Sequence, residues 1–136
     1  MKKLVSWIPA FCWAGFVYVL SSQSSVKISS STLIDFLIFK SLHIIEYTVL
    51  SFLVLFASRT TLEKKDVKVV LLSFFLSMMY AIADETHQLF VETRSGRLRD
   101  IFIDMMGVLF GLGVSWKLLP TVKPKQKSSQ RNWPRI

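Results

Sequence analysis

The chain has 136 residues, of which 51% are hydrophobic and 19% are charged, and its formal net charge is +8. The apolar residues form long blocks separated by short charged stretches, which excludes an ordinary soluble domain built on amphipathic helices and indicates a small integral membrane protein. Because the Lys and Arg residues lie between the blocks, we attribute the charge to membrane topology and expect no nucleic-acid partner.

The first apolar block covers residues 4–20 and is just long enough to cross a bilayer. A cleavable signal peptide is the competing interpretation, because Ser21 and Ser22 follow the block. The apolar core of a signal peptide is usually about 7–15 residues, so we favour a transmembrane span. The single cysteine, Cys12, lies inside this block, which excludes an internal disulfide and a Cys-based metal site.

A serine-rich connection follows at residues 21–39, and its apolar end is too short to cross a membrane alone. We interpret it as a re-entrant or surface-lying segment. The second span is predicted at residues 40–58, with His43 and Glu46 in its first turns. The basic residues that follow are assigned to a loop: Arg59, Lys64, Lys65 and Lys68.

The third span is predicted at residues 69–83, and the polar stretch 84–88 can continue the same helix. The fourth span is predicted at residues 100–119 and ends at Pro120, because proline cannot continue the helical hydrogen bonds. The sequence therefore predicts an all-α bundle of four transmembrane helices.

The distribution of charge predicts how this bundle is oriented. With the N-terminus inside, 12 of the 17 basic residues fall on the inner side, and the net charge is +10 inside against −2 outside. Since basic residues near span ends stay cytoplasmic, both termini are predicted to be cytoplasmic and the protein to be a multi-pass protein of the cell membrane. Residues 1–119 form the membrane domain, and residues 120–136 form a basic, disordered cytoplasmic tail.

Three of the predicted spans carry a polar face near their outer ends. At 100° per residue, each face occupies an arc of about 60–100° on its helix. The faces consist of Lys40, His43 and Tyr47 with Glu46 at the flank, of Tyr80, Asp84, His87 and Gln88 with Glu85 to one side, and of Asp100, Asp104, Gly107 and Gly111.

A charge at membrane depth costs at least about 2.5–3.5 kcal/mol, so such residues usually face a bundle interior. Two interpretations stay open, a structural network of salt bridges and a binding or catalytic site. A metal site is weakly indicated by the spacing of His43 with Glu46 and of Asp84 with His87, and we expect neither a metal nor another cofactor. The two glycines favour close helix packing.

The order of these residues along the chain resembles that in the VanZ-like family of small membrane proteins, which are associated with resistance to teicoplanin-type glycopeptides. The resemblance covers nearly all of residues 1–119. Its motifs are Leu20-Ser21-Ser22-Gln23, Lys40-x-x-His43-x-x-Glu46-Tyr47, Asp84-Glu85-x-x-Gln88-x-Phe90-x-x-x-Arg94, and Asp100-x-x-x-Asp104-x-x-Gly107-x-x-x-Gly111. Family members often carry Asn where this chain has Asp104, which argues against an Asn-specific role there. The resemblance implies a function in the cell envelope, and it supplies no established catalytic mechanism.

Three functions are compatible with this pattern. In the first, the polar residues bind an envelope component, either a glycopeptide antibiotic or a cell-wall precursor, through Lys40, Glu46, Tyr47, Gln88, Arg94, Asp100 and Asp104. In the second, the protein is an enzyme acting on a lipid-linked or wall-derived substrate, with Asp84 or Glu85 as acid/base and His43 as partner. In the third, it is an assembly subunit that contacts other membrane proteins through its glycines. The sequence leaves the ligand and the oligomeric state open.

Overall fold

The computed structural model describes residues 2–23, 29–91 and 97–119, and the only regular secondary structure within them is helical. The helices are α1 (Lys2–Val5), α2 (Ile8–Ser21), α3 (Thr32–Leu62), α4 (Val67–Gln88) and α5 (Leu98–Leu118). The segment Lys3–Ser21 and each of α3, α4 and α5 is long and apolar enough to cross a membrane. The predicted all-α membrane bundle of four transmembrane helices is confirmed.

The first span is broken near its start by a proline. Pro9 lies in the first turn of α2, where its missing N–H costs no helical hydrogen bond, and the chain turns between α1 and α2 just before it. Side chains then attach α2 to its neighbours. The indole N–H of Trp13 donates to the backbone carbonyl of Glu46 at 2.9 Å, and the hydroxyl of Tyr80 donates to the carbonyl of Ala14.

The central helix, α3, is longer than predicted and corrects two sequence-based assignments. Residues 32–39 are not a separate re-entrant or surface-lying segment but the first two turns of α3, and Arg59 belongs to its last turns rather than to a loop. Asp35 supports this helix start by accepting the N–H of Ser29 at 2.7 Å and by placing a negative charge near the helix N-terminus. With 31 residues, α3 is about 46 Å long and exceeds the hydrocarbon core of about 30 Å.

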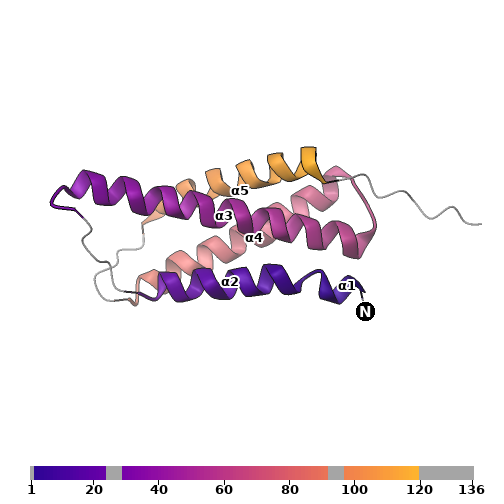
Figure 1. Ribbon diagram of the computed structural model, residues 1–136, viewed down its shortest axis with the longest axis horizontal. Coiled ribbons are helices and arrows are strands. Elements are labelled where there is room, and N and C mark those ends of the chain that lie inside the picture. Colours follow the sequence, from indigo (N-terminus) through magenta and orange to yellow (C-terminus); the bar gives the residue numbers. More distant parts are fainter. Residues whose placement is uncertain (1, 24–28, 92–96, 120–136) are drawn as a thin grey trace, which may run out of the picture.

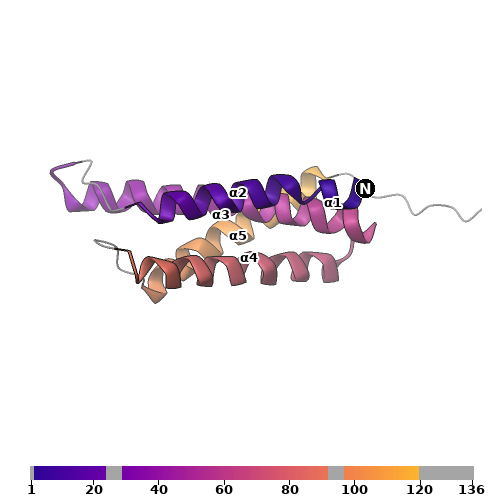
Figure 2. The same ribbon diagram turned by 90° about the horizontal axis from the view of Figure 1, so that it is seen from below.

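From α2 to α5, successive helices alternate in direction, so α3 and α5 run parallel, and α1 lies at the same end of the bundle as the last turn of α5 (Figures 1 and 2). Two glycines let α5 approach α3. A Cβ atom on Gly107 would lie 2.6 Å from the carbonyl oxygen of Ile44, and one on Gly111 would collide with the Thr48 carbonyl and the Ser51 hydroxyl. The glycine stripe is therefore covered by α3, and the hypothesis that it contacts other proteins is wrong.

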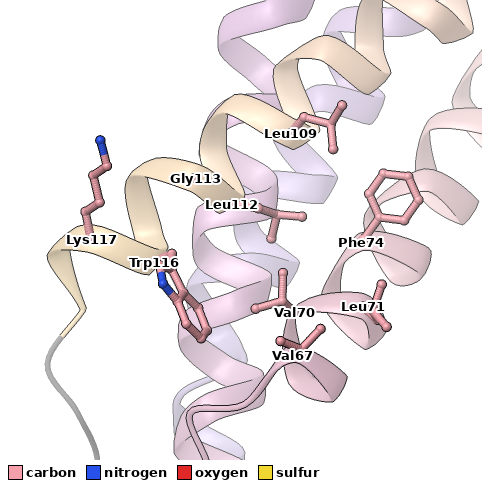
Figure 3. A pocket seen from close by; sticks show the side chains of 9 residues that line it. All are labelled: Val67, Val70, Leu71, Phe74, Leu109, Leu112, Gly113, Trp116 and Lys117. Carbon is pink, nitrogen blue, oxygen red and sulfur yellow. The ribbon is translucent and has the colours of Figure 1, made fainter.

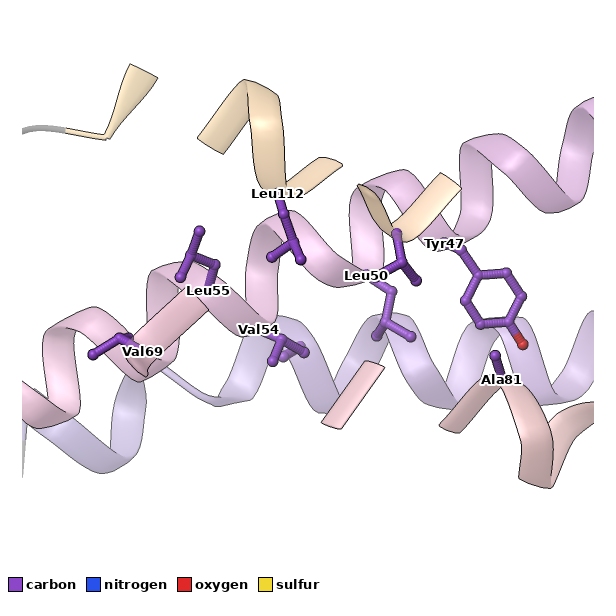
Figure 4. Packing of buried hydrophobic residues seen from close by; sticks show 9 residues of the cluster. Tyr47, Leu50, Val54, Leu55, Val69, Ala81 and Leu112 are labelled. Atoms are coloured by element: carbon purple, nitrogen blue, oxygen red, sulfur yellow. The ribbon is translucent and has the colours of Figure 1, made fainter. Parts of the chain in front are cut away.

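The polarity of the bundle is inverted relative to a soluble protein. Among the described residues, 14 polar or charged side chains are buried against 11 hydrophobic ones, while many large apolar side chains point outward. Such an exterior suits lipid, and helix association then relies on packing and hydrogen bonds. The buried apolar residues form a cluster that extends from Val69 through Leu55 and Val54 to Tyr47 and Ala81 (Figure 4).

The ends of the last two spans agree with the sequence. The polar stretch 84–88 continues α4 as predicted, and α5 ends at Leu118. Leu119 has extended backbone angles of φ −74° and ψ 127°, as expected for a residue that precedes proline. The predicted tail, residues 120–136, lies outside the described residues.

Candidate functional site

A group of ionisable and polar side chains gathers where α3 begins its buried part, α4 ends and α5 starts. We call this group the polar centre. Its members are Lys40, His43 and Tyr47 from α3, Asp84, Glu85 and Gln88 from α4, and Asp100 and Asp104 from α5. All belonged to the three predicted polar faces, and the structure brings those faces together.

An ion pair and a histidine–carboxylate contact, one helical turn apart, join α3 to α5. The ammonium nitrogen of Lys40 lies 2.8 Å from Oδ2 of Asp100, and Nδ1 of His43 lies 3.1 Å from Oδ1 of Asp104. The second oxygen of Asp100 is 3.6 Å from Nε of Arg99. The Lys40 side chain stays 18% exposed, whereas that of Asp104 is 1% exposed, so the polar centre extends from the bundle surface into its interior.

The carboxylate of Asp84 joins three helices. Its Oδ2 accepts a hydrogen bond from the hydroxyl of Tyr47 at 3.0 Å and another from the side-chain amide of Gln88 at 3.1 Å. The same amide lies 3.4 Å from the hydroxyl of Ser21 at the end of α2. Tyr47 is fully buried, with its ring in the apolar cluster and its hydroxyl at the boundary of the polar centre (Figure 4).

Glu85 connects α4 to the start of α5. Its Oε1 accepts the backbone N–H of Arg97, the residue that precedes α5. The side chain is buried, with 4% of its surface exposed. Glu85 therefore fixes the start of α5 and with it the height of Asp100 and Asp104 relative to α4.

Among the described residues, four of these carboxylates have one buried oxygen without a hydrogen-bond partner, and that of Asp100, Oδ1, lies 3.6 Å from Nε of Arg99. Asp84 Oδ1, Glu85 Oε2 and Asp104 Oδ2 are buried and have no hydrogen-bond partner among the described residues. A buried, unpaired acceptor costs about 1–3 kcal/mol, and more when it is charged, so such atoms usually have a partner such as an ordered water, an ion or a ligand. They can accept hydrogen bonds from hydroxyl or amino groups of a ligand, or exchange a proton with it.

Glu46 and Arg94 are the remaining predicted ligand-binding residues. Glu46 is half-buried at its edge, where its backbone carbonyl binds Trp13 of α2. Arg94 lies outside the described residues.

His87 belongs to a separate contact with α2. Its Nε2 lies 3.1 Å from the hydroxyl of Ser22, and its ring centroid is 4.7 Å from that of Tyr18. It thus engages α2 rather than forming the metal-type pair with Asp84 that the spacing suggested. Within the described parts of the chain, no three His, Cys, Asp or Glu side chains gather as metal ligands would.

Sequence reasoning missed one buried charge at the opposite end of α3. Arg59 is 3% exposed, and its Nη1 donates to the carbonyl of Ser115 at 3.3 Å. Its position on the inner face of α3 could have been predicted, because Ser51, Leu55 and Arg59 follow one another at intervals of four and so share a helix face. The assignment to a loop obscured this.

The fold and the polar centre define a multi-pass helical membrane protein with an ionisable cluster buried near one end of its bundle. The family model described as VanZ/LLP1 matches residues 3–119. The chain therefore belongs to the VanZ/LLP1 family, as the motifs of its polar residues indicated. Comparison with curated proteins and with solved structures gave no match.

Proposed function

We propose that this protein acts in the cell envelope, where its polar centre binds the polar head of an envelope component and thereby changes susceptibility to teicoplanin-type glycopeptides. The observation that supports this most is the set of buried acceptor oxygens on Asp84, Glu85 and Asp104. Structural salt bridges alone do not account for them, because a purely structural carboxylate gains stability from pairing both oxygens.

The charge distribution supports an extracytoplasmic position for the polar centre. It lies at the end opposite to α1 and the last turn of α5, which are flanked by the basic stretches assigned to the cytoplasm. Glycopeptides and wall precursors meet on the outer side of the membrane. Since the polar centre is buried between helices, it suits a small polar head group borne on a lipid better than a bulky glycopeptide.

Replacing Asp84 with asparagine is expected to lower the minimum inhibitory concentration of teicoplanin for the producing strain to that of a deletion strain. Asn keeps an oxygen for Tyr47 but removes the carboxylate charge from the polar centre. The measurement is a glycopeptide susceptibility panel with the membrane level of each variant checked by immunoblot. Cys12→Ser, at an exposed position on α2, is the control and should behave as wild type. Full protection by the Asp84→Asn variant would contradict the proposal.

A second candidate is an enzyme that acts on a lipid-linked or wall-derived substrate. It is favoured by the buried pair of His43 and Asp104, because a carboxylate that orients an imidazole is a common arrangement in acid/base catalysis. The free oxygens of Asp84 and Glu85 would then act as acid or base on the substrate.

Catalysis predicts that the substrate accumulates in strains carrying His43→Ala or Glu85→Gln, since loss of an acid/base group lowers a rate by about 10²–10⁴-fold. Profiling of membrane lipids and wall fragments measures this against wild type and Cys12→Ser. Unchanged profiles in both variants, together with altered teicoplanin susceptibility, would contradict the enzyme hypothesis and favour binding without a chemical reaction.

A further inference from the structure

An apolar groove lies at the end of the bundle opposite to the polar centre, between the first half of α4 and the second half of α5. It has a volume of about 490 Å³ and is lined by Val70, Phe74, Leu109, Leu112, Gly113 and Trp116, among others. Figure 3 shows the two helices as its walls, with Phe74 and Leu109 toward the middle of the bundle and Trp116 toward its end. The lining extends from Val67 to Phe74 on α4 and from Leu109 to Lys117 on α5, or about 10–12 Å of helix.

Basic residues lie near the end of this groove. Lys117 belongs to its lining, and the charged groups of Arg59 and Lys65 lie 5.1 and 5.3 Å from the ring centroid of Trp116. The guanidinium of Arg59 is buried, and its Nε and Nη2 have no hydrogen-bond partner among the described residues. The adjacent acid, Asp66, caps α4 by accepting the N–H of Val69.

We propose that this groove binds one anionic glycerophospholipid of the adjacent leaflet, with an acyl chain between α4 and α5 and the phosphate near Lys65 and Lys117. The apolar walls match a chain that points toward the bilayer centre, and the cations match a phosphate at its surface. Juxtamembrane Lys and Arg attract anionic lipid at about 1 kcal/mol each. The segment that follows adds Lys and Arg but no Asp or Glu, so it would be repelled from the same rim.

Gly113 provides the test, because a Cβ atom built on it meets no neighbouring atom within 4 Å. Gly113→Phe should fill the groove without disturbing the bundle, whereas Gly113→Ala leaves most of it open. The full-length protein, purified in detergent and delipidated, is titrated with phosphatidylglycerol or phosphatidylcholine, and bound lipid is counted by native mass spectrometry. Thermal unfolding verifies that each variant is folded.

Wild type and Gly113→Ala are expected to bind one phosphatidylglycerol with clear preference over phosphatidylcholine, and Gly113→Phe to lose that molecule. Lys65→Gln combined with Lys117→Gln should weaken phosphatidylglycerol binding by about 25-fold and leave phosphatidylcholine unaffected. Equal affinity for the two lipids would overturn the proposal, as would unchanged binding in Gly113→Phe. A change from dimer to monomer in Gly113→Phe would overturn it in favour of a second copy of the chain as the occupant.

Discussion

Replacing Gly111 with valine is expected to prevent the protein from accumulating as a folded bundle. The new Cβ would collide with the Thr48 carbonyl, which belongs to the backbone of α3 and cannot rotate away. Overpacking usually costs about 1–3 kcal/mol, and a backbone neighbour places this variant at or above the upper end. The measurement is the yield of monodisperse protein after detergent extraction, followed by thermal unfolding of whatever remains.

Gly113 is the matched control for this experiment. It lies two residues further along α5 and has no atom within 4 Å of an added Cβ, so Gly113→Val should retain yield and melting temperature close to wild type. If both valine variants lose stability equally, the cause is the general effect of valine in α5 and not the close contact with α3.

Replacing Lys40 with methionine is expected to destabilise the bundle by about 3 kcal/mol, because it leaves the buried carboxylate of Asp100 without its principal cation. This value is at the lower end of the destabilisation found when one partner of a buried ion pair is removed. We choose it because Lys40 is partly exposed and Arg99 stays near the second carboxylate oxygen of Asp100. Asp100→Leu should cost less, because the long lysine side chain can extend to the membrane surface. Thermal unfolding of both single variants measures the difference.

The double variant, Lys40→Met with Asp100→Leu, separates structure from function. An apolar pair of similar size often restores the stability that either single change removes. Under the proposed function, we therefore expect a stable protein without an effect on teicoplanin susceptibility. Retention of that effect in the stable double variant would show that the pair only holds the helices together.

The polar centre was predictable because an apolar span of this length forms an α-helix and carries few charged residues. Once a span is helical, the angle between Asp100 and Asp104 follows from their spacing, and the cost of burial directs both toward other helices. The contacts confirm this for α3, where Lys40, His43 and Tyr47 reach carboxylates on two different helices.

The remaining features depend on information that spacing lacks. Hydropathy marks the part of a helix that lies in lipid but not where the helix ends, so the first turns of α3 and the position of Arg59 were assigned wrongly. The direction of His87 depends on α2, whose Ser22 and Tyr18 are distant in sequence. The pairing of Glu85 with a backbone N–H has no signal in residue type at all.

The two cations that α3 carries along its length, Lys40 and Arg59, have a consequence for the surrounding membrane. They are separated by 19 residues, or about 28 Å of helix, which is close to the thickness of a hydrocarbon core. Both are tied to α5, Lys40 through Asp100 and Arg59 through the carbonyl of Ser115, so neither helix can slide past the other to adapt. We therefore expect the bundle to match one bilayer thickness, so that a thinner or thicker membrane either deforms around it or tilts it as a unit.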